Sequence, residues 1–128
     1  MLYVTDTHSL VWFLSEDASL SKSAKNIFEK AEKGEAVIVV PTIVLGEFLY
    51  ACQKKKVQDN FFRIIHAIGK SDNYASFDLT VEVVMECRNL FGLSELHDKM
   101  IVSTARMLKA PLITRDRQII RSGVVEVI

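Results

Sequence analysis

The chain of 128 residues lacks several features that mark whole classes of protein. No apolar run approaches the roughly 18 residues needed to cross a bilayer, and no basic leader followed by an apolar stretch stands at the N-terminus. The only cysteines, Cys52 and Cys87, fall on the apolar sides of expected helices, so we expect neither a disulfide nor a zinc site. These absences predict a cytoplasmic protein.

The chain also carries no excess of charge of either sign. Sixteen acidic residues balance sixteen basic ones, so no long-range field attracts phosphate, and any nucleic-acid binding must come from local patches. Hydrophobic residues make up 49% of the chain. That content lets a single domain, residues 1–128, bury a real core.

Short apolar segments alternate with longer amphipathic ones. We expect strands at residues 2–6, 36–40, 74–77, 111–114 and 124–127. We expect helices at residues 8–14, 21–33, 42–56, 61–69, 81–91 and 95–109. The alternation predicts an α/β fold with a central, mostly parallel sheet of about five strands flanked by helices. Thr42 is expected to cap its helix, and Val84 and Met85 are expected to enter the core.

Four carboxylates stand at unusual positions in this pattern. Asp6 and Asp116 follow strand segments, whereas Glu47 and Asp98 lie in helical stretches with apolar residues three and four positions away. Isolated buried carboxylates are unfavourable without a partner or a metal ion. Strand ends share one edge of a parallel sheet, where ligand sites form. We therefore expect the four acids to converge there, with at least one pKa raised by repulsion and desolvation.

Each acid also has a simpler structural interpretation. Asp6 and Asp116 can cap the helices that follow them. Asp98 can be a solvated first-turn acid favoured by the helix dipole, and Glu47 can lie half-exposed at the edge of its helix. Only the joint placement of the four favours a shared site.

The segments that carry these acids resemble the motifs of the PIN domain family. Residues 4–14 (VTDTHSLVWFL) resemble its opening motif, and residues 41–47 (PTIVLGE) its second acidic motif. Residues 96–105 (LHDKMIVSTA) are similar to its third, and residues 112–116 (LITRD) to its fourth. The resemblance covers essentially the whole chain, in the family's order, and implies a PIN-like three-layer fold.

The same resemblance implies an activity. It is that of an Mg²⁺- or Mn²⁺-dependent ribonuclease whose metal-binding and catalytic acids are Asp6, Glu47, Asp98 and Asp116. Hard divalent cations prefer such oxygen ligands, and four carboxylates can support one ion or two. Thr114 stands at the family's usual hydroxyl position, where it can orient an acid or a metal-bound water, or only satisfy its own strand.

Other polar residues lie near these acids in sequence. Lys99, Arg115 and Arg117 are candidates for RNA phosphate contacts, with solvated surface charges or pairing with the acids as the alternative. His8 is expected to have a structural role at a helix start, because oxygen-rich magnesium sites seldom need imidazole. Trp12 is expected in the core, and His97 is given no role.

Small single-domain members of the family, like this chain, resemble VapC-type toxins, which are paired with an antitoxin. The resemblance thus implies a small antitoxin partner, whose tail can cover a groove and set a basic side chain against the acids. A homodimer is expected as well, because two helices are rich in large apolar residues, namely Phe48, Leu49, Tyr50, Phe61, Phe62, Ile64 and Ile65.

Alternative functions come from three classes. The first is a stand-alone RNA-processing nuclease of the same fold without an antitoxin. The second is a phosphatase of the haloacid dehalogenase type. It is discounted because His8 stands where the Asp-x-Asp pattern of that family has its second Asp, the general acid. The third is a non-catalytic module. A receiver domain would need paired acids after the first strand, where residues 5–7 (TDT) supply one, and the presence of all four acids weighs against a module that binds RNA or a partner without cleaving it.

Overall fold

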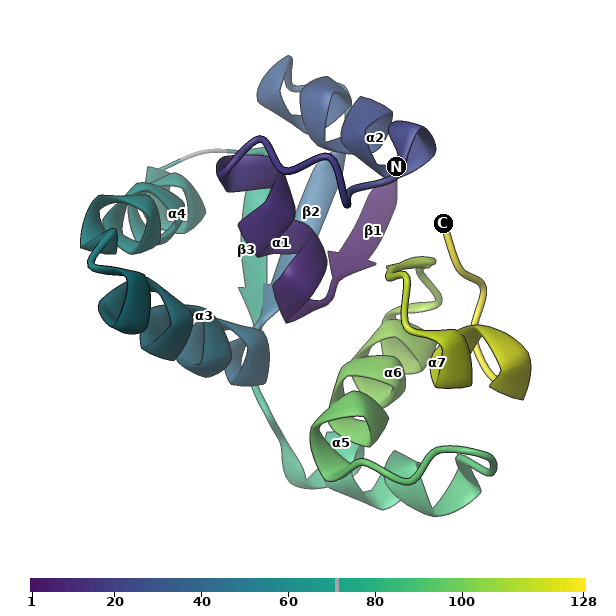
Figure 1. The fold of residues 1–128 in the computed structure, drawn as a ribbon. Coiled ribbons are helices and arrows are strands. Elements are labelled where there is room, and N and C mark those ends of the chain that lie inside the picture. The colour runs from purple at the N-terminus through teal and green to yellow at the C-terminus, as the bar shows by residue number, and fades with distance from the viewer. Residues whose placement is uncertain (71) are drawn as a thin grey trace.

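The computed structural model of the protein describes residues 1–70 and 72–128, and these residues build a four-stranded parallel sheet (Figure 1). The strands are β1 (Leu2–Thr5), β2 (Val37–Pro41), β3 (Tyr74–Phe77) and β4 (Leu112–Ile113). Their order across the sheet is β3-β2-β1-β4, and every pair runs parallel. The order places β1 beside β4, so the segments that follow these two strands leave the sheet at the same edge.

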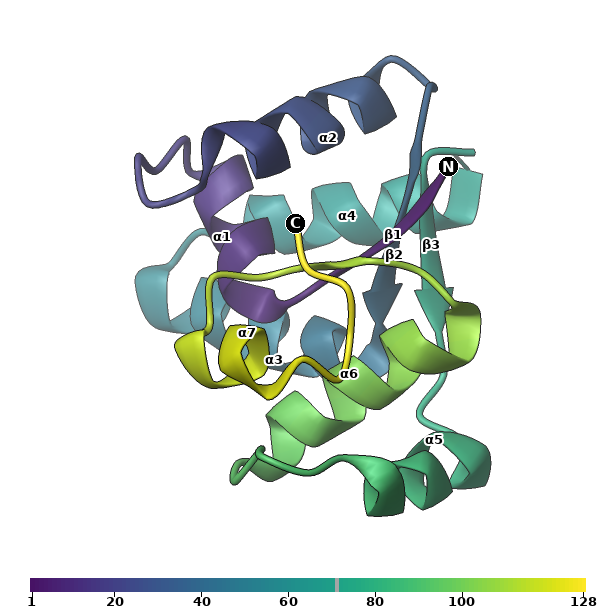
Figure 2. The same ribbon diagram turned by 90° about the vertical axis from the view of Figure 1, so that its right-hand side faces the viewer.

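Helices connect the strands and cover the sheet (Figure 2). They are α1 (Thr7–Leu14), α2 (Lys22–Glu32), α3 (Thr42–Lys55), α4 (Gln58–Lys70), α5 (Val81–Glu86), the short 3₁₀ helix η1 (Cys87–Asn89), α6 (Leu96–Leu108) and α7 (Arg117–Ser122). The predicted α/β architecture with a parallel sheet is therefore confirmed. None of the helices in the described residues is long and apolar enough to span a bilayer.

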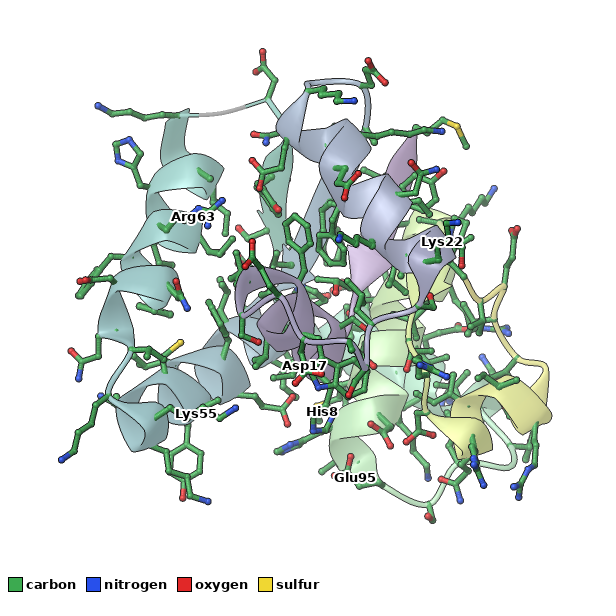
Figure 3. All side chains as sticks on the ribbon, turned by 45° about the horizontal axis from the view of Figure 1, so that its top comes forward. His8, Asp17, Lys22, Lys55, Arg63 and Glu95 are labelled. Carbon is green, nitrogen blue, oxygen red and sulfur yellow. The ribbon has the colours of Figure 1, made fainter. Side chains whose placement is uncertain are left out.

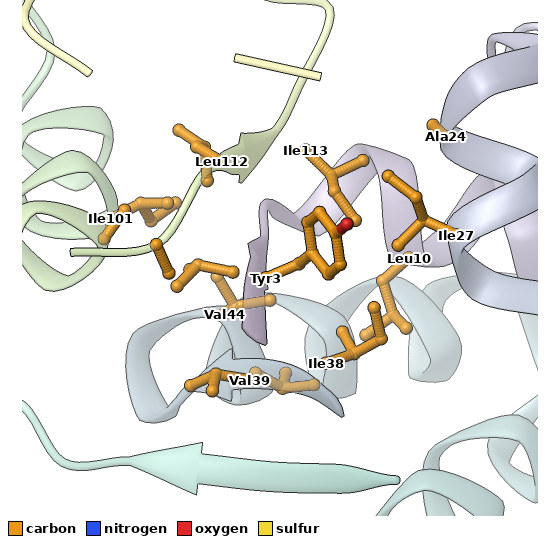
Figure 4. Close-up of a cluster of buried hydrophobic side chains, with 14 of the residues drawn as sticks. Tyr3, Leu10, Ala24, Ile27, Ile38, Val39, Val44, Ile101, Leu112 and Ile113 are labelled. Carbon is orange, nitrogen blue, oxygen red and sulfur yellow. The ribbon is translucent and has the colours of Figure 1, made fainter. Parts of the chain in front are cut away.

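The core lies on both faces of the sheet. Tyr3 of β1 pairs with Ile38 of β2 and shares a face with it, where Ile27 of α2 packs (Figure 4). Leu112 of β4 lies on the other side, near Ile101 of α6. All five side chains are buried. Because strands β1 and β2 are covered on both faces, their sequences are continuous apolar runs.

The expected fifth strand is wrong. Residues 124–127 reach the edge of β4 but form only an isolated bridge between Leu112 and Val127. Two hydrogen bonds make this contact, from Leu112 N to Glu126 O at 2.8 Å and from Ile128 N to Leu112 O at 3.0 Å. Since β4 itself is two residues long, the ladder has no room to extend.

Two further expectations are corrected by the structure. Thr42 begins α3 and does not cap it; its hydroxyl accepts a hydrogen bond from Leu79 N at 3.0 Å, which ties the segment after β3 to α3. The helix expected over residues 81–91 ends at Glu86, and Val84 and Met85 are exposed. Val84 and Met85 face solvent because α5 packs on α6, away from the sheet (Figure 2).

Candidate metal centre at the edge of the sheet

Asp6 is the first residue after β1, and both of its carboxylate oxygens are hydrogen-bonded. Oδ1 accepts from the backbone N–H of Ser9 at 2.8 Å, which makes Asp6 the N-cap of α1. Oδ2 accepts from the hydroxyl of Thr114 at 2.5 Å. The side chain is buried, with 8% of Asp6 exposed. Its position and orientation are therefore fixed by two segments that lie 108 residues apart in sequence.

Thr114 joins Asp6 to Asp116. Its Oγ1 donates to Asp6 and also accepts from the backbone N–H of Asp116 at 3.1 Å. Asp116 in turn caps α7 through Oδ1, which accepts from Ile119 N at 3.0 Å. Thr114 is buried, whereas Asp116 is exposed. Of the two roles left open for the Thr114 hydroxyl, the structure thus shows orientation of an acid.

Glu47 lies in the second turn of α3 and is held on both sides. The Thr7 hydroxyl donates to Oε1 at 2.8 Å, and His97 Nδ1 lies 3.3 Å from Oε2. The Glu47 side chain keeps 34% of its surface exposed. His97, for which the sequence suggested no role, is therefore a polar partner of Glu47. It stands 50 residues away, so no local sequence pattern could have indicated the contact.

Asp98 lies in the first turn of α6, and Glu95 caps the start of this helix. Glu95 accepts from His97 N at 3.1 Å and from Asp98 N at 2.9 Å, one bond to each carboxylate oxygen. Desolvation raises the pKa of Asp98 to about 6, and the negative charges of Asp116, Glu95, Asp6 and Glu47 add to the effect. The expectation that one acid of the set has a raised pKa is confirmed for Asp98.

All four predicted acids line one cavity of about 290 Å³, which we call the acidic cavity. Its lining residues are Asp6, Thr7, His8, Trp12, Glu47, Asp98, Ile101, Arg115 and Asp116. The acids reach it from four separate segments, two after strands and two within helices. The two structural interpretations for Asp6 and Asp116 also hold, because both residues cap a helix and line the cavity at once.

Of the three basic residues predicted to contact RNA phosphate, only one lines the acidic cavity in the described structure. Arg115 lines the acidic cavity, and its Nη1 donates to the carbonyl of Ser19 at 2.7 Å. Lys99 and Arg117 are not among the residues that line the cavity within the described chain. His8 and Trp12 do line it, with their ring centroids 5.7 Å apart. Trp12 also packs against the core, as expected.

The donor set fits a hard divalent cation. Four carboxylates are the oxygen ligands that Mg²⁺ and Mn²⁺ prefer. Within the described residues, however, no three His, Cys, Asp or Glu side chains form a group that could hold a metal ion by themselves. This spacing does not suit an ion that demands a closed protein cage, such as structural zinc. It suits Mg²⁺, which keeps several waters and binds through one or two carboxylates plus substrate phosphate.

The sequence model of the PIN domain family matches residues 3–124, so the chain belongs to this family. The fold resembles VapBC2 from Rickettsia felis, solved bound to a promoter DNA fragment (TM-score 0.74, 19% identity, covering 100% of this chain and 98% of that one). It also resembles a toxin–antitoxin complex from Klebsiella pneumoniae (TM-score 0.70, 19% identity, 98% and 95% covered). A third match is VapC20 of Mycobacterium tuberculosis, a sarcin–ricin loop cleaving toxin (TM-score 0.69, 16% identity, 99% and 98% covered). The comparison with curated proteins finds no match.

Proposed function

We propose that this chain is an endoribonuclease that hydrolyses RNA phosphodiester bonds with Mg²⁺ or Mn²⁺. The observation that carries the proposal is the acidic cavity, in which carboxylates from four separate segments meet at the carboxyl edge of a parallel sheet. Membership of the PIN domain family supports it. The similar fold of VapC20, a toxin that cleaves the sarcin–ricin loop, supports the choice of substrate.

Asp6, Glu47, Asp98 and Asp116 are the candidate ligands, of which one or two would bind the metal directly, together with water and substrate phosphate. When bound, a divalent ion polarises a phosphate oxygen and lowers the pKa of a coordinated water. The chain's own residues orient the ligands: Thr114 fixes Asp6, while Thr7 and His97 hold Glu47. Asp98 accepts no hydrogen bond from the described residues and has a raised pKa. It is the carboxylate whose charge a cation would relieve most.

The test is metal-dependent cleavage of a labelled RNA by the purified protein. We expect cleavage with Mg²⁺ or Mn²⁺, none with excess chelator, and a strong loss in the Asp98→Asn variant. Asp59→Asn, an acid in the first turn of α4 and outside the cavity, is the matched control. Tight RNA binding without cleavage under any metal condition would favour the non-catalytic binding module. Metal-dependent transfer of a phosphoryl group from an added acyl phosphate to an aspartate would favour the receiver module.

We also infer that the chain is the toxin of a VapBC-type pair. Two of the similar structures are a VapBC assembly and a toxin–antitoxin complex, and the similarity spans 98% and 95% of those chains. A basic antitoxin side chain set against the acidic cavity would block metal or phosphate through charge-assisted hydrogen bonds. Co-expression with the product of an adjacent upstream reading frame should give a complex without nuclease activity. Full activity and no complex would favour a stand-alone RNA-processing nuclease.

Self-association is the remaining part of the proposal. Of the apolar residues expected at a dimer interface, Phe48 and Ile64 fill the core instead. Tyr50 of α3 stays exposed, with 66% of its surface accessible, as do Phe62 and Ile65 of α4, with 61% and 40%. This narrows the expected interface to the outer faces of α3 and α4. Sedimentation should show a dimer that Phe62→Ser shifts to monomer; a monomer of the wild type at high concentration would exclude it.

A further inference from the structure

Gln118 joins α7 to the segment that leads into α6. Its Oε1 accepts two hydrogen bonds from Ser94, one from the backbone N–H at 3.0 Å and one from the hydroxyl at 3.2 Å. We call this pair of contacts the Gln118 clamp. The two residues lie 24 positions apart in sequence. The clamp therefore holds together two segments that the chain itself connects only through α6 and β4.

The segment that the clamp holds, residues 90–95, is also fixed by the core. Leu90 and Leu93 are buried, so the segment is anchored on either side of Gly92. Gly92 has a φ of 85°, in the left-handed region that favours glycine. A Cβ built on Gly92 would lie 3.5 Å from the Cβ of Ser122. The segment thus runs close along α7, which is independent evidence that the two are docked on each other.

The clamped segment ends at the start of α6, where Asp98 lies. Ser94 is followed by Glu95, the cap of this helix, and Asp98 is in its first turn. Figure 3 shows Glu95 on the same side of the molecule as His8, which lines the acidic cavity. Among the described hydrogen bonds, Asp98 takes part through its backbone N–H, which donates to Glu95. The position of its carboxylate therefore depends on where α6 begins.

The other end of the clamp lies beside Asp116. Gln118 stands two residues after it, on the helix that Asp116 caps. Two residues before it, Thr114 orients Asp6. The segment that follows β4 thus reaches three of the four acids of the cavity. It contains one of them, hydrogen-bonds a second, and holds the start of the helix that carries the third.

The separation of Asp98 and Asp116 matters because of the ion that the cavity is proposed to bind. Mg²⁺ demands near-ideal octahedral geometry with ligands at about 2.0–2.1 Å, whereas Ca²⁺ accepts roughly six to eight oxygens at about 2.3–2.6 Å in flexible arrangements. Two acids at the starts of separate helices meet the stricter requirement only if the helices keep a fixed separation. In the described structure, the hydrogen bonds that join these two helix starts are those of the clamp.

From these observations we propose that Gln118 is a positioning residue that sets the separation of Asp98 and Asp116. It does not line the cavity in the described structure, and it acts through Ser94 on the start of α6. The consequence is selectivity of the acidic cavity for Mg²⁺ or Mn²⁺ over the larger and more loosely coordinated Ca²⁺. This inference rests on the proposed nuclease function and adds to it the means by which the fold selects the ion.

A contact of this kind can also serve stability alone. A hydrogen bond between neutral groups stabilises a fold by about 1 kcal/mol, and its loss would then leave the relative affinities for two ions unchanged. Loss of a positioning contact instead weakens the ion with the stricter geometry more than the other. The ratio of the Mg²⁺ and Ca²⁺ dissociation constants therefore separates the two roles.

The test measures both dissociation constants by titration calorimetry of the metal-free protein, without RNA. Gln118→Met removes the acceptor and keeps the length of the side chain. It should raise the Kd for Mg²⁺ about tenfold, the lower end of the range for groups that orient metal ligands, and change the Kd for Ca²⁺ little. Gln118→Glu keeps an accepting oxygen, and its added charge acts on both ions alike. It should therefore keep the ratio near that of the wild type.

Ser94→Ala removes one of the two donors and leaves the N–H, so it should change the ratio less. Combined with Gln118→Met it should add nothing, because the acceptor is already gone. Asn89→Leu is the matched control. It also removes a side-chain amide contact, in which Asn89 donates to Glu86 Oε2 at 3.2 Å, but neither residue lines the acidic cavity in the described structure. Both constants should stay unchanged.

Cleavage of labelled RNA connects the clamp to the reaction. The Mg²⁺ concentration for half-maximal cleavage should rise about tenfold in Gln118→Met and stay at the wild-type value in Asn89→Leu. If Gln118→Met and Ser94→Ala lower stability but keep the wild-type ratio of the two constants, the inference is wrong while the nuclease function stands. The same holds if the wild type binds Ca²⁺ as tightly as Mg²⁺. If the wild type neither binds Mg²⁺ or Mn²⁺ nor cleaves RNA, both proposals are wrong.

Discussion

The acidic cavity adjoins a second depression of about 780 Å³ between α1 and α3, which we call the α1–α3 groove, and the two differ in how their side chains are held. In the cavity, the two oxygens of Asp6 and the two of Glu47 all have polar partners within 3.3 Å. In the groove, Tyr50, Lys54 and Lys55 are exposed on the surface of α3. The cavity is thus rigid and acidic, whereas the groove is adaptable and basic.

This difference matches two separate tasks, which are the positioning of the groups that react and the binding of the substrate. Groups that take part in a reaction must be held close to their working geometry, since a misplacement of about 1 Å can cost a hundredfold in rate. Groups that accept bases of any sequence gain from mobility and from flat aromatic faces. Placing four acids in one cavity is also unfavourable, because desolvation and mutual repulsion raise the pKa of Asp98.

The largest expected effect comes from the substitution of Asp6 in the acidic cavity. Asp6→Ala removes the cap of α1 and leaves the buried Thr114 hydroxyl without its acceptor. We expect cleavage to fall by about a hundredfold or more and the free energy of unfolding to drop by about 2 kcal/mol. Single-turnover cleavage and thermal unfolding measure the two effects.

Asp17→Ala is the control for this loss. Asp17 also accepts a backbone N–H bond, from Ser19 at 2.8 Å, but it is exposed and does not line the acidic cavity. Its removal should leave cleavage unchanged and cost less stability. Equal effects of the two substitutions on cleavage would show that Asp6 is not a catalytic acid.

The second prediction concerns the metal. Mg²⁺ or Mn²⁺ at a hundred times its Kd should stabilise the folded protein by about 2.7 kcal/mol, because it binds the folded cavity and not the unfolded chain. For a chain of this size the melting temperature should rise by roughly 10 °C. The variant Asp6→Asn with Asp98→Asn should lose most of the rise. A rise of the same size in that variant would place the ion elsewhere.

Much of the fold could be predicted from local sequence alone. Continuous apolar runs identified β1 and β2, because strands covered on both faces have no polar side. The predictions failed where tertiary contacts decide. Residues 124–127 have a strand-like pattern, but their only available partner in the described structure, β4, is two residues long. Val84 and Met85 have core spacing, but α5 lies outside α6, so they face solvent.

The site was predictable to a similar extent. The position of Asp6 and Asp116 after strands indicates the shared edge, since parallel strands end together. Contacts between distant segments could not be read in this way. The pair of Glu47 and His97 joins α3 to α6 across 50 residues. Lys54 looks like an ordinary helix-ending cation until the packing of α1 against α3 makes it part of a groove.

The third prediction uses the raised pKa of Asp98. In the unfolded chain this carboxyl has an ordinary pKa of 3.8, and in the folded protein about 6. The folded state therefore binds the proton more tightly, and unfolding releases it between these two pH values. Stability should fall as pH rises from about 4 to about 6 and then stay at the lower level.

Asp98→Asn removes this penalty, so it should stabilise the metal-free protein near neutral pH. We expect a gain of about 1 kcal/mol, smaller than the full pKa shift implies, because Asp98 is only half-buried and solvent screens its neighbours. Below about pH 4 the two proteins should be equally stable. Chemical unfolding across this pH range with chelator present measures the difference. A variant less stable than the wild type at neutral pH would show that Asp98 is not under charge strain.

The smallest expected effect separates the basic residues near the cavity from those of the groove. Arg115 lines the acidic cavity, but its guanidinium already donates to the Ser19 carbonyl, and neither Lys99 nor Arg117 lines the cavity in the described structure. Neutralising all three with glutamine should therefore lower the salt slope of RNA binding by about 0.7, the value for one phosphate contact. The pair Lys54 and Lys55 should lower it by about twice as much. A reduction near 2 in the triple variant would mean about three phosphate contacts and would make the rim of the cavity the main phosphate site. An unchanged slope would leave phosphate binding to the groove alone, because the remaining charges around the cavity are acids that repel the same phosphates.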